Sequence, residues 1–98
     1  MKKIYAIVKH PGEQLGHIME IENTLDSLQK AVGGHIETVA MANKWSVICD
    51  VEGLLKGKPY NCDVYGVEFV GTILVVGVEG EELVDVPIDL NDWKDVIG

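Results

Sequence analysis

The stretch LDSLQKAVGGHIETV, residues 25–39, constrains the fold of this chain more than any other segment, because a helical pattern meets a strand pattern at two glycines. Four apolar residues recur at helical spacing and form one face: Leu25, Leu28, Ala31 and Val32. Asn23 or Thr24 is expected to cap the first turn. The pattern predicts a helix over about residues 24–32, followed at once by a strand.

Paired glycines also occur in phosphate-binding turns, but those turns follow a strand and precede a helix, so that helix N–H groups point at the anion. Here the order is reversed, because Gly33 and Gly34 follow the helix. The groups left open at this helix end are carbonyls, which repel phosphate. We therefore interpret Gly33 as the residue that ends the helix in a left-handed conformation.

Patterns elsewhere predict strands joined by turns. Alternating or β-branched runs mark strands at residues 2–8, 17–22, 35–41 and 44–51. Ala42 and Asn43 are expected to form the hairpin turn between the last two of these. Residues 69–80 are apolar on both faces, which indicates a central strand buried on both sides. Gly71 and Gly77 within that run suggest close packing or a bulge.

The C-terminal end predicts an edge strand that stops at Pro87 and then a short helix over about residues 90–97. Asp89 is expected to cap this helix, and Trp93 to face inward. Residues 52–68 carry several turn-forming residues and are expected to be a long irregular segment. The chain is therefore predicted to be a single α+β domain, residues 1–98, with a mostly antiparallel sheet of about five or six strands.

The charge is negative and unevenly placed. The net charge is −8, and the chain has no arginine. Residues 1–58 hold seven acids and seven lysines, whereas residues 59–98 hold nine acids and one lysine, Lys94. Proteins that bind nucleic acid use Lys and Arg to displace counterions from phosphates, so direct nucleic-acid binding is not expected. The acidity either serves solubility or forms a face for a basic partner, including a face that imitates DNA.

No pattern typical of a catalytic or metal site is present. The histidines His10, His17 and His35 fall at no metal-ligand spacing, and there is no Cys-x-x-Cys. Cys49 and Cys62 are interpreted as cytosolic thiols, Cys49 as a small buried hydrophobe and Cys62 as a loop residue open to exposure. We expect no catalytic residue, no metal and no cofactor, and no enzyme activity. No apolar run approaches the roughly 20 residues that a membrane helix needs.

The segment LLKGKPYNCDVYG, residues 54–66, is the candidate ligand-binding region. It combines aromatic rings that stack on bases, an amide that reads base edges and a cation for phosphate. The predicted ligand-binding residues are Lys58, Tyr60, Asn61 and Tyr65. The alternative is an ordinary loop whose Pro, Asn and Gly form turns and whose tyrosines pack down.

The order of these motifs resembles a family of short phage and mobile-element proteins classed as a domain of unknown function. The family pattern is a leucine-rich helix ending in Val-Gly-Gly, an acid-bearing strand, a Leu-x-x-x-Pro-x-Asn loop and a Gly-Thr-apolar strand. The resemblance spans roughly residues 4–84 and rests on Leu25, Leu28, Gln29, Val32, Gly33, Gly34, Ile36, Glu37, Leu55, Pro59, Asn61, Gly71 and Thr72. The sequence departs from it at Cys62-Asp63, where the usual continuation is basic.

The resemblance implies a bacterial cytoplasmic setting and an accessory role such as counter-defence. The first functional hypothesis is a homo-oligomer that sequesters a small nucleotide-like host signal without catalysis. The second is an acidic protein-interaction module, such as a DNA-mimicking inhibitor of a host restriction or nuclease enzyme, that acts through its acidic C-terminal half. The position of the acids in space separates the two, because one continuous acidic face favours mimicry.

Overall fold

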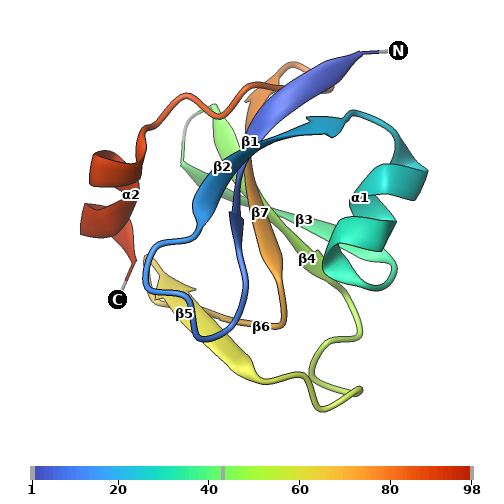
Figure 1. Ribbon diagram of the computed structural model, residues 1–98, viewed down its shortest axis with the longest axis vertical. Helices are drawn as coiled ribbons and strands as arrows, with labels where there is room; N and C mark the ends of the chain where they lie inside the picture. Colours follow the sequence, from blue (N-terminus) through green and yellow to red (C-terminus); the bar gives the residue numbers. More distant parts are fainter. Residues whose placement is uncertain (1, 43, 98) are drawn as a thin grey trace.

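The computed structural model describes residues 2–42 and 44–97. Figure 1 shows a twisted central sheet with α1 on one side and with α2 and the β5–β6 hairpin on the other. The elements in chain order are β1 (Lys3–Lys9), β2 (His17–Glu22), α1 (Leu25–Val32), β3 (Ile36–Ala42), β4 (Trp45–Asp50), β5 (Tyr60–Val64), β6 (Val67–Val70), β7 (Ile73–Glu79), β8 (Glu82–Val84) and α2 (Leu90–Val96). The predicted α+β fold with a mostly antiparallel sheet is confirmed.

The six-stranded sheet has the order β2-β1-β7-β4-β3, and β8 also pairs with β7. Every pairing among the described residues is antiparallel, and β7 pairs with three strands, namely β1, β4 and β8. Its side chains are buried from Ile73 to Val76, so the prediction of a central strand buried on both sides is confirmed. The apolar run 69–80 is nevertheless divided, because Gly71 has φ +73 and separates β6 from β7.

Two apolar clusters pack against the two faces of the sheet. Leu28 and Val32 of α1 cover one face, against alternate residues of the sheet strands such as Ala6 and Leu74. Trp93 of α2 and Phe69 of β6 cover the other face. Trp93 is fully buried, and its indole Nε1 donates a hydrogen bond to the Leu15 carbonyl at 2.8 Å. The inward position predicted for Trp93 is confirmed, and this residue fixes α2 to the loop before β2.

The expectation of an irregular segment over residues 52–68 is wrong in its second half, where β5 and β6 form a hairpin. Tyr65 and Gly66 have φ 49 and φ 81, so both central turn residues are left-handed, as in a type I′ turn. The sequence did not indicate this turn, because Tyr rarely adopts a left-handed backbone conformation. Cys62 is buried in the strand, which corrects the expectation that its thiol lies in a loop.

The ends of α1 and α2 agree with their predicted caps. The Thr24 hydroxyl accepts a hydrogen bond from the Ser27 N–H at 3.2 Å, and Asp89 accepts one from the Asp92 N–H at 2.8 Å. Gly33 has φ 80 and ψ 30, which is the left-handed conformation expected of it. In the β3–β4 hairpin, Ala42 is the last residue of β3 and pairs with Trp45, so the expectation that it forms the turn is wrong. The other predicted turn residue, Asn43, lies outside the described residues.

A buried carboxylate holds the glycine end of α1 in place. The Asp50 side chain, 1% exposed, lies 2.9 Å from the Lys56 ammonium and 2.8 Å from the Lys58 ammonium. Lys58 Nζ also donates to the Val32 carbonyl at 2.7 Å, and Lys56 Nζ donates to the Gly33 carbonyl at 3.3 Å. The two lysines therefore offset the negative end of the helix dipole, while Asp50 offsets one of their two positive charges.

The neighbouring glycines leave room for this cluster. A Cβ on Gly34 would lie 2.6 Å from the Asp50 carboxyl carbon, and a Cβ on Gly71 would lie 2.8 Å from Lys58 Cδ. Both distances are shorter than side chains tolerate, so a larger residue at either position would displace the ion pairs. Gly34 and Gly71, 37 positions apart in the sequence, thus serve the same packing requirement.

Replacing Gly33 tests the left-handed helix end. Gly33→Val should lower the melting temperature, because a β-branched side chain is strained at φ 80. Gly33→Asn is the matched control and should lose less, because Asn adopts left-handed conformations more readily. Differential scanning calorimetry measures both variants. An unchanged melting temperature for Gly33→Val would contradict this account.

Asp50→Asn should lower the free energy of unfolding by about 3 kcal/mol, because it leaves two ammonium groups without their counter-ion. This is the lower end of the usual range for a buried pair, since the Lys56 and Lys58 side chains remain 40% and 21% exposed. Asp26→Asn is the matched control: its exposed pair with Lys30 should contribute at most about 0.5 kcal/mol. Urea unfolding at neutral pH measures both.

The effect of Asp50→Asn on stability should depend on pH. The hydrogen bonds from Lys56 and Lys58 hold the pKa of the Asp50 carboxyl well below its usual range. A lowered folded-state pKa stabilises the fold above the unfolded-state value of about 3.9, and that stabilisation is lost as the pH falls further. The difference between wild type and Asp50→Asn should therefore shrink below pH ~4. A difference that is constant from neutral pH to pH ~2.5 would contradict this role of Asp50.

Candidate functional site

The hairpin and the segment before it hold the four residues predicted to bind ligand, and the polar groups of Lys58 and Asn61 are engaged with distant parts of the fold. Lys58 lies against Asp50 and the Val32 carbonyl, as described above. The buried Asn61 amide donates to the Lys9 carbonyl at 2.8 Å and to the Gly71 carbonyl at 2.7 Å. Its Oδ1 accepts from Lys9 Nζ at 2.7 Å. Asn61 therefore joins β5 to β1 and to the turn before β7, and both of its N–H donors are used within the fold.

The other two predicted residues face solvent at opposite ends of β5. The Tyr60 hydroxyl donates to Asp63 Oδ1 at 2.9 Å, and this hydrogen bond to a carboxylate raises the pKa of Tyr60. The Tyr65 ring lies 5.9 Å from the Trp45 ring at an angle of 42°. Five residues of extended chain span roughly 16 Å, so the two tyrosine rings do not meet in one pocket.

The two thiols are buried in the cluster beneath the hairpin. Burial, together with the nearby carboxylates of Glu37 and Asp50, raises the pKa of the Cys49 thiol to about 11. Burial also raises the pKa of Cys62, against the opposing effect of the Lys9 charge. A thiol with so high a pKa is protonated at neutral pH, so Cys49 lacks the thiolate that nucleophilic attack requires. The prediction that Cys49 is a small buried hydrophobe is confirmed.

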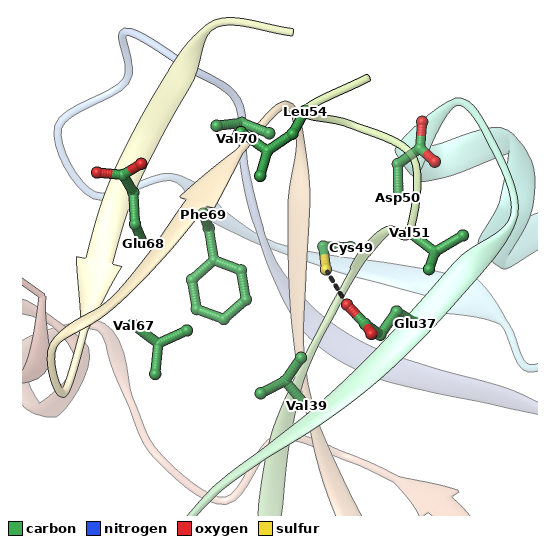
Figure 2. A pocket seen from close by; sticks show the side chains of 10 residues that line it. All are labelled: Glu37, Val39, Cys49, Asp50, Val51, Leu54, Val67, Glu68, Phe69 and Val70. Atoms are coloured by element: carbon green, nitrogen blue, oxygen red, sulfur yellow. Dashed lines mark hydrogen bonds between the residues drawn. The ribbon is translucent and has the colours of Figure 1, made fainter. Parts of the chain in front are cut away.

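A small cavity of about 140 Å³ lies between β6 and the β3–β4 pair (Figure 2). Val67 and Phe69 stand on one side of it, and Val39 and Cys49 on the other. The Cys49 thiol donates to Glu37 Oε1 at 4.0 Å, which Figure 2 marks with a dashed line. Most of the residues that line this cavity are apolar, and the acids Glu37, Asp50 and Glu68 give it a polar surface as well.

A second cavity, of about 520 Å³, is an open groove beside the glycine end of α1. Its lining mixes both charges with polar groups: Asp26, Gln29, Lys30, Gly33, Gly34, His35, Glu52 and Lys56. None of the four residues predicted to bind ligand lines either of these two cavities.

Most lysines form ion pairs or hydrogen bonds with other residues of the same chain. Lys56 and Lys58 pair with Asp50, and Lys9 binds Asn61. Three exposed lysines also form ion pairs, namely Lys2 with Glu82, Lys3 with Glu20, and Lys30 with Asp26. Six of the eight lysines therefore lie against partners in the same chain.

The acids of the C-terminal half are distributed differently. The acidic layer, as we name it, comprises the acids on α2, its cap and the β5–β6 hairpin: Asp63, Glu68, Asp89, Asp92 and Asp95. Its two parts adjoin, because Val64 of β5 forms a β-bridge with Ile97 after α2. Lys94 is the lysine of this layer, and within residues 2–42 and 44–97 none of the five acids forms an ion pair. The layer therefore presents uncompensated negative charge.

The fold also brings together two histidines that lie seven positions apart in the sequence. The His10 and His17 rings are 6.1 Å apart; His10 Nδ1 lies 2.8 Å from the Thr72 hydroxyl, and His17 Nδ1 lies 3.3 Å from Glu13. In the described part of the chain, no three His, Cys, Asp or Glu side chains are grouped so as to hold a metal ion. None of the helices described is both long enough and apolar enough to span a membrane.

Comparison with known proteins gives one match. Residues 1–97 match the family model described as "Domain of unknown function (DUF3846)". No curated protein and no solved structure matches the chain. The resemblance to a family of unknown function, inferred from residues 4–84, is thereby confirmed over almost the entire sequence. The chain belongs to the DUF3846 family.

Proposed function

We propose that this protein is a non-catalytic accessory module that binds a basic protein partner through its acidic layer. The observation that carries this proposal is that most lysines have partners within the fold, whereas the acids of the acidic layer have no cationic partners among the described residues. The fold engages six of eight lysines internally but leaves the five acids of the acidic layer without cationic partners in the part of the chain that is described. A surface of one sign steers an oppositely charged partner and selects against others.

The same observation bears on the choice between a protein partner and a phosphate-bearing ligand. Lys58, the cation predicted to meet phosphate, already lies against a carboxylate and a helix carbonyl. A phosphate approaching it would have to displace Asp50 from a buried position. The acids of α2 and the hairpin instead have no ion pairs in the described part of the chain, so they are open to the basic groups of a surface that normally binds DNA. A phage or mobile-element protein in the bacterial cytoplasm would use such acids to block a host restriction or nuclease enzyme.

Neutralising two acids of α2 tests this proposal. Asp92→Asn/Asp95→Asn should weaken capture of a basic protein from bacterial lysate roughly tenfold, with affinity falling steeply as salt rises. Glu79→Gln/Glu81→Gln is the matched control, because it removes the same charge from the exposed β7–β8 end. Affinity capture quantified by mass spectrometry reports both. Equal loss in the two variants, or capture that is insensitive to salt, would contradict binding through the acidic layer.

A second proposal, sequestration of a nucleotide-like ligand by a homo-oligomer, is supported by the exposed rings of Tyr60 and Tyr65. Aromatic rings stack on bases, and two protomers together would supply more of a pocket than one hairpin does. Tyr60→Ala/Tyr65→Ala should then abolish a discrete small-molecule mass seen by native mass spectrometry. Tyr5→Ala, which removes an equally exposed ring from β1, is the control and should retain it. Asn61→Ala is less informative, because it also breaks the bonds to Lys9 and Gly71.

A further inference from the structure

We propose that the outer edge of β3, together with the adjoining 140 Å³ cavity, is a docking groove for an extended segment of a partner protein. The segment would add a strand to β3, place one apolar side chain in the cavity, and set Lys or Arg beside the carboxylates that line it. This inference rests on the proposed function, because it specifies how a basic protein partner is held. We name this surface the β3 groove.

β3 lies at one end of the sheet. In the strand order β2-β1-β7-β4-β3, it pairs with β4 on one side, and no described strand lies on its other side. The outward N–H and C=O groups of such an edge are a template for a further strand. β6 lies across the cavity from β3 and, within the described residues, pairs with β5 alone (Figure 2). An added strand would therefore run along β3, with β3 on one side and β6 on the other.

The cavity has the size and part of the lining that one side chain needs. A volume of about 140 Å³ suits one branched apolar side chain, whereas pockets for drug-sized ligands measure roughly 300–1,000 Å³. Leu54 lines the cavity and is 77% exposed, although its side chain is apolar. Val51 and Val67, which also line the cavity, are exposed as well. An incoming apolar side chain would remove this surface from water.

The groove carries negative charge, and the residues of β3 that line it have a fixed spacing. Glu37 and Glu68 lie on opposite sides of the cavity and, within residues 2–42 and 44–97, neither forms an ion pair with a lysine. Glu37 and Val39 are two positions apart, so they share one face of β3. An added strand would set a basic side chain opposite Glu37 and an apolar one opposite Val39, also two positions apart. The groove therefore favours the pattern basic-x-apolar.

The charge also argues against a second copy of this chain as the occupant. Each copy carries a net charge of −8, and six of its eight lysines are already engaged. Pairing two copies at the β3 edge would bring Glu37 of each near the acids of the other. Like charges brought together in this way oppose association.

The test uses a short labelled peptide with one central leucine, a lysine two positions away on each side, and threonine elsewhere. Fluorescence anisotropy gives the affinity, and ¹⁵N NMR locates the binding site. We expect amide shifts along Ile36–Ala42, and roughly tenfold weaker binding when the lysines are moved next to the leucine or alternate backbone amides are methylated. Peptides that all bind equally, or shifts that leave β3 unaffected, would overturn the inference.

Two neighbouring leucines supply matched protein variants. Leu54→Ser should weaken peptide binding roughly tenfold, whereas Leu55→Ser should not, because Leu55 is 87% exposed but does not line the cavity. Both side chains are exposed, so neither change should prevent folding. Equal affinity in the two variants would contradict docking at the cavity. Concentration-dependent self-association that Leu54→Ser abolishes would identify a second copy as the occupant and overturn the assignment to a partner.

The two proposals fail separately. If the peptide does not bind but a basic protein is still captured through Asp92 and Asp95, the β3 groove is wrong and the acidic layer stands. If the peptide binds the Asp92→Asn/Asp95→Asn variant normally, but neutralising those acids never affects capture, the groove stands and the acidic layer is wrong.

Discussion

The interaction on which the rest of this structure depends is the ion cluster around Asp50. This carboxylate ends β4, and its two lysines come from the segment that leads to the β5–β6 hairpin. Through those lysines it reaches the last carbonyls of α1. One side chain therefore joins the sheet, the helix that covers one face and the approach to the hairpin that covers the other. Removing it would leave two ammonium groups close together without a counter-ion, and only the carbonyls at the end of α1 would still attract them.

The sequence predicted the features that depend on short-range patterns. The spacing of Leu25 and Leu28, the Thr24 cap and the left-handed Gly33 follow from rules that act within a few residues, and all are observed. The apolar run of β7 likewise identified the central strand. The β5–β6 hairpin was missed because its turn places Tyr65 in a conformation that usually requires Gly or Asn.

The candidate site depends on contacts that no local pattern records. Lys58 and Asn61 combine with tyrosines in a composition typical of ligand-binding loops, but their partners, Asp50 and Lys9, lie on other strands. The cavity is also non-local, because Glu37, Leu54 and Phe69 come from three separate segments. Leu54 was the one residue in the sequence that could have indicated the cavity. It is an apolar residue in a segment otherwise rich in turn formers, so it has to pack against another group or remain exposed.

The position of β7 in the chain has a consequence for how this protein folds. The central strand begins at Ile73, yet β1 and β4, which lie far earlier in the sequence, both pair with it. Without β7, β1–β2 and β3–β4 are separate hairpins, which are at best marginally stable on their own. Pairing with β7 closes long loops, and the entropy of closing such loops slows folding. The sheet is therefore expected to form slowly and in one cooperative step, when β7 joins the two hairpins.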